Sequence, residues 1–269
     1  MSTRVAEVDE RRILFANTET LLWPEANISK GDLIDYYVEL AGVVLPFLAL
    51  RPLSLLRCPD GVAGECVYQK TAPPGLPQWI PTRRVRSDQA ALGYAEYVIG
   101  SERAALAYLV NLGYTSFHPW ACLVDAVDRP DLMLFDLDPT EIAFREVRNA
   151  ALLVRSLLAG FKIRSWVKTS GGAGVHVIVP LDPVYSFEQT LTAASTIPYA
   201  VREYPGAPVA TPLEWSDLER SVYPEDFHFH NVRERLRQRG DPLRGLFAER
   251  QSLAPLLEGG RARRARPIA

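Results

Sequence analysis

Hydrophobic and polar positions along the chain predict short strands separated by amphipathic helices. The longest apolar runs, at 132–137 and 175–179, are typical of buried strands, and shorter runs at 53–56, 97–99 and 114–117 predict further strands. Strands mixed with helices predict a mixed α/β architecture of the α+β class, with the strand order left open.

Apolar residues recur at helical spacing in three segments, 33–44, 104–112 and 147–158, and each segment predicts one helix. Ser29 and Ser101 stand just before the first two segments. A serine hydroxyl at this position accepts hydrogen bonds from the unpaired amides of the first helical turn, so both residues are predicted N-caps.

Composition narrows the class of protein. A chain of 269 residues with 48% hydrophobic and 23% charged residues can bury a substantial core. The formal net charge of −2 leaves no basic footprint of nucleic-acid binding, so such a function must rest on local sites. The longest apolar run, 40–50, contains Pro46 and is too short to cross a bilayer, which predicts no membrane partner.

Three cysteines, Cys58, Cys66 and Cys122, form an odd set without a metal-binding doublet. This pattern predicts reduced thiols and a cytoplasmic location rather than a disulfide scaffold. The first residues lack the charged and then apolar pattern of a secretory signal, which favours the same location.

The segment 134–139, Leu-Phe-Asp-Leu-Asp-Pro, carries the clearest chemical signal. Alternate side chains of a strand share a face, so Asp136 and Asp138 are predicted to point the same way, roughly 6–7 Å apart. Neighbouring carboxylates repel each other, and Mg²⁺ or Mn²⁺ bound between them removes that repulsion. Paired cations stabilise the attacking and leaving oxygens in polymerases. The alternative is that Asp-Leu-Asp-Pro simply ends a strand in a turn.

A second signal is the glycine-rich stretch 168–176, Lys-Thr-Ser-Gly-Gly-Ala-Gly-Val-His. Its glycines allow a sharp turn whose amides can approach an anion closely. His176 follows on the next strand, on the face opposite Val175 and Val177. The alternative is an ordinary glycine hairpin with a hydrogen-bonded histidine. His118, at the end of another predicted strand, is by itself more typical of a structural residue.

A series of short motifs runs through nearly the whole chain, from about residue 13 to residue 253. The motifs are Trp23-Pro24, Ser29-Lys30-Gly31-Asp32-Leu33, Arg57-Cys58-Pro59-Asp60-Gly61, Gln69-Lys70, Ala72-Pro73-Pro74-Gly75, His118-Pro119-Trp120, Asp136-Leu137-Asp138-Pro139, the stretch 169–176, Tyr199-Ala200-Val201-Arg202 and the stretch 205–212. In this order they resemble the polymerase domain of bacterial DNA ligase D, of the archaeo-eukaryotic primase superfamily. The resemblance implies a primase-like fold and an enzyme that adds nucleotides, often ribonucleotides, to DNA ends held for joining, with Mn²⁺ or Mg²⁺ as cofactor.

The resemblance also implies roles at individual positions, which can be grouped by the ligand that each residue would contact. They are Asp136 and Asp138 for the catalytic metal; His118, Ser170, His176 and Arg202 for the triphosphate of the incoming nucleotide; Lys30 for the 5′-phosphate of a DNA end; and Tyr68 for stacking on template DNA.

The sequence departs from the family at a functional position. In the family, a long helix and a further strand supply a third metal-binding aspartate, whereas here 187–192 joins the flanking segments directly. Neither Asp182 nor Asp217 occupies the matching position. A paired-cation site needs anionic ligands, so this loss threatens catalysis. Smaller changes that remove contacts to DNA or nucleotide are Thr20 for a lysine, Val67 for an aromatic residue and Ala173 for a basic residue.

Together these observations predict one primase-polymerase-like domain at 1–258, lacking one helix and one strand, and a basic, mobile tail at 259–269. The lost apolar surface predicts lower stability or an exposed sheet edge. The predicted activity is transfer of nucleotides from nucleoside triphosphates to gaps or breaks with a 5′-phosphate in non-homologous end joining, alongside separate ligase and end-binding proteins. The alternatives are a catalytically impaired relative that still binds DNA ends, and a damaged copy without a settled function.

Overall fold

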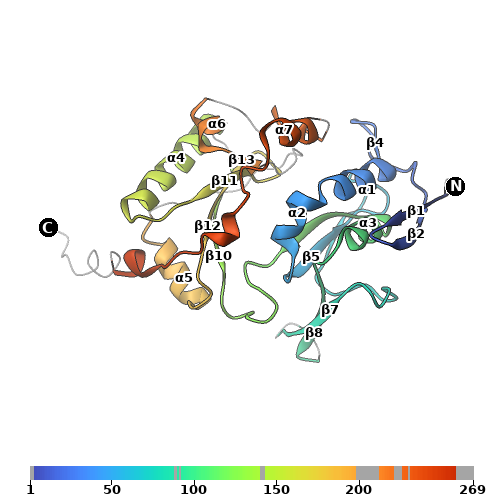
Figure 1. The fold of residues 1–269 in the computed structure, drawn as a ribbon, viewed down its shortest axis with the longest axis horizontal. Helices are drawn as coiled ribbons and strands as arrows, with labels where there is room; N and C mark the ends of the chain where they lie inside the picture. Colours follow the sequence, from blue (N-terminus) through green and yellow to red (C-terminus); the bar gives the residue numbers. More distant parts are fainter. Residues whose placement is uncertain are drawn as a thin grey trace. The chain divides into compact units, whose positions relative to one another are not determined.

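The computed structural model describes residues 3–87, 90, 92–139, 143–197, 212–220, 226–229 and 231–258. The chain divides into two compact units, Met1–Val127 and Asp128–Ala269, each with its own hydrophobic core (Figure 1). The predicted tail at 259–269 lies outside the described residues. None of the helices in the described part of the chain is long and apolar enough to cross a membrane.

The first unit is built on an antiparallel sheet in the order β6-β5-β8-β7, with β9 also paired to β5. Helices α2 and α3 contribute to the core that covers one face of this sheet. Two short hairpins, β1-β2 and β3-β4, complete the unit. Its elements are β1 (Thr3–Val8), β2 (Arg11–Ala16), β3 (Leu21–Trp23), β4 (Ile28–Ser29), α1 (Lys30–Glu39), α2 (Ala41–Leu48), β5 (Pro52–Arg57), β6 (Val67–Gln69), β7 (Thr82–Arg86), β8 (Tyr94–Ile99), α3 (Arg103–Asn111) and β9 (Tyr114–Pro119).

Helix α1 begins as the sequence predicts. The Ser29 hydroxyl accepts a hydrogen bond from the Asp32 amide at 3.1 Å, and the Asp32 carboxylate accepts one from the Ser29 amide at 2.8 Å. The prediction of one helix over 33–44 is wrong, because the chain bends at Leu40 (φ −90°, ψ 8°). This bend lets the uniformly apolar α2 pack on the sheet through residues such as Leu48.

The predicted cap of α3 at Ser101 is also wrong, because the helix begins one residue later and its N-cap is Glu102. The capping group comes instead from Asp9, in the turn between β1 and β2. The Asp9 carboxylate accepts hydrogen bonds from the Ala104 amide at 3.3 Å and from the Arg103 guanidinium at 2.7 Å. A carboxylate at this end of a helix also interacts favourably with the helix dipole.

The same hairpin holds the other end of α3. The Asn111 side chain accepts a hydrogen bond from the Ala16 amide at 3.0 Å and donates one to the Leu14 carbonyl at 3.1 Å. The hairpin β1-β2 therefore supplies an acceptor for an unpaired amide in the first turn of α3 and anchors the last residue of the helix through its side chain.

Two cysteines form a disulfide, which corrects the prediction of three reduced thiols. Cys58 and Cys66 are bonded, with their Cα atoms 4.4 Å apart, and Cys122 is buried and takes no part in the disulfide. The cause is the strand register: Arg57 at the end of β5 pairs with Val67 at the start of β6, so the two cysteines are the next facing pair of the hairpin.

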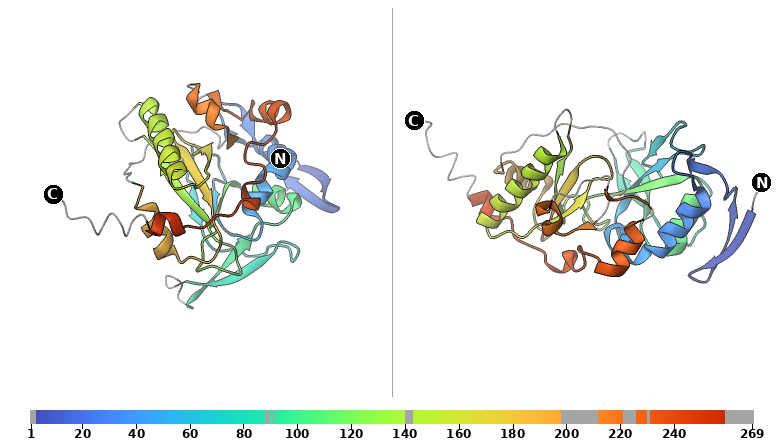
Figure 2. Two further views of the ribbon diagram at one scale, coloured as in Figure 1. Left: turned by 60° about the vertical axis from the view of Figure 1, so that its left-hand side comes forward. Right: turned by 90° about the horizontal axis from the view of Figure 1, so that it is seen from above.

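The second unit contains a four-stranded antiparallel sheet in the order β10-β12-β11-β13. The long helix α4 packs along one face of this sheet (Figure 2). Within the described residues β10 is an edge strand. The elements are β10 (Leu132–Leu137), α4 (Phe144–Gly160), β11 (Trp166–Thr169), β12 (Val175–Pro180), α5 (Phe187–Ala194), β13 (Pro212–Leu213), α6 (Trp215–Glu219), α7 (Val232–Arg239) and the 3₁₀ helix η2 (Leu246–Ala248).

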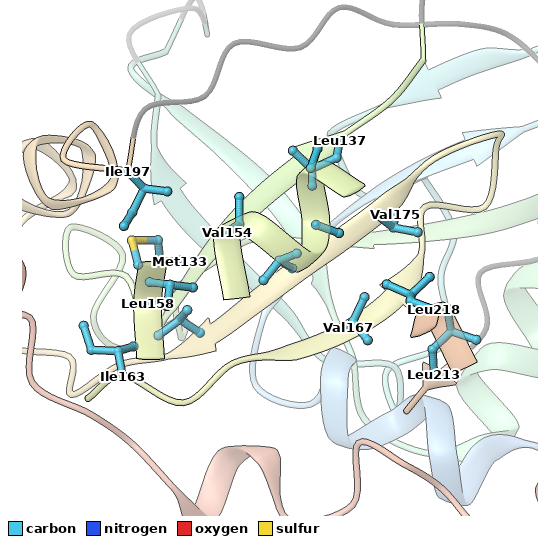
Figure 3. Packing of buried hydrophobic residues seen from close by; sticks show 14 of the residues in the cluster. Met133, Leu137, Val154, Leu158, Ile163, Val167, Val175, Ile197, Leu213 and Leu218 are labelled. Carbon is cyan, nitrogen blue, oxygen red and sulfur yellow. The ribbon is translucent and has the colours of Figure 1, made fainter. Parts of the chain in front are cut away.

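Strand alternation separates the core of this unit from its polar face. Figure 3 shows Met133, Leu137 and Val175 of the sheet pointing toward Val154 and Leu158 of α4, and all five are buried. The predicted strands at 132–137 and 175–179 and the predicted helix at 147–158 are confirmed. Because successive side chains of a strand alternate, the residues between these core positions project from the face opposite α4.

Candidate active site

Three polar side chains form a row across the face of the second unit that α4 does not cover. Asp136 on β10 pairs in register with His176 on β12, and His176 pairs with Lys168 on β11. Side chains of facing residues on adjacent antiparallel strands lie on the same face, so the register alone brings these three groups together.

Asp136 and His176 are joined by a hydrogen bond of 3.0 Å between the carboxylate and Nε2. This bond lowers the pKa of Asp136, so the carboxylate is ionised at neutral pH. Burial lowers the pKa of His176, an effect that the nearby Lys168 reinforces and the Asp136 hydrogen bond opposes. The histidine is therefore neutral at neutral pH and donates its Nε2 proton to Asp136. Its placement opposite Val175 and Val177 is as the sequence predicts.

Lys168 is the site residue that sequence reasoning missed. Its ammonium donates to the Thr169 carbonyl at 2.9 Å. Burial lowers the pKa of Lys168 to about 8, against the attraction of Asp136 and Asp138, which raises it. The group therefore stays mostly protonated at neutral pH. Only the pairing of β11 with β12 reveals that Lys168 faces His176, and that register is not readable from the sequence.

Asp138 lies just beyond the end of β10 and depends on a glycine for its position. A Cβ atom added at Gly174 would lie 1.7 Å from Oδ1 of Asp138 and 2.4 Å from the Leu137 carbonyl oxygen. Real Cβ atoms do not come this close to other atoms, so only glycine permits this packing. The glycine-rich turn thus holds the second carboxylate, a role that its sequence did not indicate.

The turn that joins β11 to β12 is organised by Ser170. Its hydroxyl oxygen accepts hydrogen bonds from the amides of Gly172, at 3.1 Å, and Gly174, at 3.2 Å. The Ser170 amide donates to the Gly174 carbonyl at 2.9 Å, and Gly171 adopts a left-handed conformation (φ +100°). Two of the amides in the turn are therefore directed at Ser170. This geometry matches the alternative prediction of a glycine hairpin with a hydrogen-bonded histidine. The Ser170 hydroxyl keeps a proton for a hydrogen bond to a phosphate oxygen.

Asp217 is engaged elsewhere in the second unit. This buried residue forms ion pairs with Arg235 and with Arg239, the latter at 2.9 Å, and accepts a hydrogen bond from the Glu214 amide at 3.0 Å. Burial alone would raise the pKa of Asp217, but these partners together lower it. Within the part of the chain that the structure describes, no three His, Cys, Asp or Glu side chains are placed to hold a metal ion together.

Two predicted site residues meet in the first unit. The ring of Tyr68 on β6 lies edge-on to the ring of His118 on β9, with centroids 5.2 Å apart. Both strands pair with β5, which places the rings together. Tyr68 is 62% exposed, and the His118 ring makes a 2.9 Å hydrogen bond with the Ser116 hydroxyl.

Lys30 is the first residue of α1 and is buried. Its ammonium donates to the Asn111 carbonyl at 3.3 Å, and burial lowers its pKa. Its amide donates to the carbonyl of Thr20 at 2.8 Å. Lys30 and Thr20, predicted to occupy the two phosphate-binding lysine positions of the family, are thus neighbours. Arg202, predicted to contact triphosphate, lies outside the described residues.

Comparison with known proteins identifies relatives across most of the chain. A family model described as LigD, primase-polymerase domain, matches residues 29–197 and 187–243. The multifunctional non-homologous end joining protein LigD of Pseudomonas aeruginosa is 29% identical over 198 residues, which cover 69% of this chain and 22% of that protein. The corresponding protein of Mycolicibacterium smegmatis is 27% identical over 283 residues, which cover 88% of this chain and 36% of that protein. The chain therefore spans well under half the length of these relatives.

The alignments bear on the helix and strand that the sequence predicts to be missing. The 283 aligned positions outnumber the 269 residues of this chain, so the relative has residues without a counterpart here. The two segments matched by the family model overlap at 187–197. The predicted junction at 187–192 lies within this overlap.

A solved structure shares the fold. The polymerase domain from Mycobacterium tuberculosis ligase D, determined in complex with DNA, superposes with a TM-score of 0.73 at 22% sequence identity. The match covers 90% of this chain and all of that one. The primase-like mixed α/β fold expected from the sequence is confirmed.

Proposed function

This chain belongs to the family of LigD primase-polymerase domains, and we propose that it is a nucleotidyl transferase that adds nucleotides at gaps or breaks in DNA during non-homologous end joining. The observation that carries the proposal is the pairing of Asp136 with His176 at the end of β10, beside Asp138 and the glycine-rich turn. A cytoplasmic location, and cooperation with separate ligase and end-binding proteins, are part of the proposal.

Asp136 and Asp138 would hold the divalent cation. Carboxylate oxygens are the hard ligands that Mg²⁺ and Mn²⁺ prefer, Asp136 is ionised, and its side chain is 54% exposed, so the donor set fits a cation. When bound, the cation would supply charge neutralisation at the phosphoryl group being transferred and at its leaving group.

Residues next to the carboxylates would bind the triphosphate. The Ser170 hydroxyl oxygen already accepts two amide hydrogen bonds, so its proton is what it can offer to a phosphate oxygen. His176 donates from Nε2 to Asp136 and thereby keeps that carboxylate oriented. Contacts from His118 and Arg202 to the triphosphate are carried over from the family and remain part of the proposal.

DNA recognition is assigned to the first unit. Tyr68 presents an exposed ring that could stack on a template base, a contact worth about 1–3 kcal/mol. Lys30 sits at the N-terminus of α1, where the helix dipole favours a phosphate. To bind a 5′-phosphate, the Lys30 ammonium must break its hydrogen bond to the Asn111 carbonyl and donate to the phosphate instead.

Primer extension tests the proposal. A gapped, 5′-phosphorylated duplex with Mn²⁺ and ribonucleotides is expected to be extended, and Asp136→Asn is expected to abolish extension. Asp182→Asn is the matched control, because it makes the same change of carboxylate to amide in the same unit, away from the carboxylate pair. Lack of extension by a folded wild-type chain, or equal extension by both variants, would refute catalysis at this site.

A second candidate function is binding of DNA ends without catalysis. The aligned part of a relative contains residues that this chain lacks. The described residues also offer no third metal-binding carboxylate beside Asp136 and Asp138, which favours this function. Such a chain would bind 5′-phosphorylated ends more tightly than unphosphorylated ends and lose this preference with Lys30→Met. Equal affinity for the two ends would exclude it.

A further inference from the structure

Lys168 places a positive charge in the same cross-strand row as Asp136. It faces His176 across β11 and β12, and His176 faces Asp136 across β12 and β10, so all three share one row on the sheet. Both Asp136 and Asp138 attract the Lys168 ammonium electrostatically. The charge therefore lies on the same face of the sheet as Asp136 and interacts with both carboxylates.

The Lys168 ammonium is held as part of the fold. Its Nζ donates to the carbonyl of Thr169 at 2.9 Å, and Thr169 is fully buried. A lysine on an exposed surface samples many rotamers, whereas this one is tied to its own strand. Strand β11 is in turn fixed between β12 and β13.

The charge balance of the row limits how many divalent ions it can hold. Two carboxylates would attract cations strongly, but the fixed ammonium cancels part of their charge and repels further cations. His176, the nearest further side chain, is hydrogen-bonded to Asp136, and among the described residues no group of three His, Cys, Asp or Glu side chains could hold a metal ion. A paired-cation site needs more anionic ligands than this.

We propose that Lys168 is a positioning residue whose ammonium takes the place of one divalent cation, so that Asp136 and Asp138 bind a single metal ion. The proposal rests on the proposed function and deepens it. In this arrangement the charges of the two carboxylates are balanced by one metal ion and the ammonium, without the third carboxylate that the sequence predicts to be missing.

Counting bound Mn²⁺ tests the proposal without relying on activity. The EPR signal of free Mn²⁺ is followed as the ion is added to the full chain at neutral pH. The wild-type chain is expected to bind one ion. Lys168→Met, which keeps an unbranched side chain one atom shorter and removes its charge, is expected to bind Mn²⁺ at least about tenfold more tightly or to take up a second ion.

Two controls separate this effect from a change of fold. Lys168→Arg keeps the charge and is expected to bind Mn²⁺ as the wild type does. Asp182→Asn should leave binding unchanged. If the Lys168→Met chain melts at the same temperature as the wild type, a change in its Mn²⁺ affinity is due to the site and not to the fold. Lys168→Gln provides a second neutral variant if Lys168→Met does not fold.

The outcomes distinguish this inference from the proposed function. Two ions of similar affinity on the wild type, or unchanged affinity and stoichiometry in both neutral variants, would overturn the role of Lys168 and leave a metal-dependent transferase standing. No Mn²⁺ binding by the folded wild type would overturn the metal-dependent function, and this inference with it.

Discussion

Substituting Gly174 with alanine tests whether the close packing at this glycine positions Asp138. The backbone of Gly174 is not left-handed, so the effect of the added methyl group comes from space alone. To bring the nearest contact from 1.7 Å to 3.0 Å, the Asp138 carboxylate must retreat by about 1.3 Å. The Leu137 carbonyl, at 2.4 Å, must also retreat, and it belongs to the backbone of β10.

Overpacking of a well-packed site costs about 1–3 kcal/mol, and a clash with strand backbone falls at the upper end. Gly174→Ala is therefore expected to lower the free energy of unfolding by about 3 kcal/mol and the melting temperature by about 6–12 °C. Because Asp138 must move, Mn²⁺ affinity should fall as well. Urea unfolding followed by tryptophan fluorescence, together with a Mn²⁺ titration, measures both effects.

Gly160→Ala is the matched control for Gly174→Ala. Gly160 is the last residue of α4, and a Cβ atom there would meet nothing within 4 Å. The same methyl group should raise stability by about 0.5 kcal/mol, because alanine favours helix more than glycine does. Equal effects of the two substitutions, or native stability and Mn²⁺ affinity in Gly174→Ala, would refute the packing argument.

Three further predictions concern stability and association. Asp217→Asn leaves two arginines without their carboxylate and is expected to cost about 3 kcal/mol in urea unfolding at neutral pH. Because the folded state lowers the pKa of Asp217, the stabilisation by its carboxylate should be complete at neutral pH and fade as pH falls below about 3.9. A cost of Asp217→Asn that does not decrease as the pH is lowered below that value would contradict the prediction. Cys66→Ser, which removes the disulfide with Cys58, should cost about 2–3 kcal/mol, and an unchanged melting temperature would argue against its contribution. Leu134 is 47% exposed on the edge strand β10, so Leu134→Lys should reduce any concentration-dependent association in sedimentation; a wild type that stays monomeric at all concentrations removes this expectation.

Much of the second unit is predictable because local patterns agree with its packing. The apolar runs of β10 and β12 identify the core face, and alternation then assigns Asp136 and His176 to the other face. Lys168 could not be assigned in this way, because its partner is decided by the pairing of β11 with β12. Register depends on the whole sheet and the turn between its strands, which a single sequence does not reveal.

The errors in the first unit also come from contacts that local sequence patterns do not reveal. The disulfide between Cys58 and Cys66 follows from the facing positions of β5 and β6, whereas counting cysteines suggested reduced thiols. The cap of α3 comes from Asp9, which lies more than ninety residues earlier in the chain, so the nearby Ser101 was a misleading signal. Strand pairing decides the disulfide and a contact between distant segments decides the cap, and neither can be read from local patterns.

The hairpin β1-β2 has a practical consequence for producing shortened forms of this protein. The family match begins at residue 29, which invites removal of everything before it. Such trimming would delete Asp9 and the strand that binds Asn111, and so leave both ends of α3 without their partners. Lys30 donates to the carbonyl of Asn111, so the shortened protein would also loosen the anchor of this lysine. An expression boundary chosen from similarity alone would thus impair a predicted DNA contact that lies inside the retained sequence.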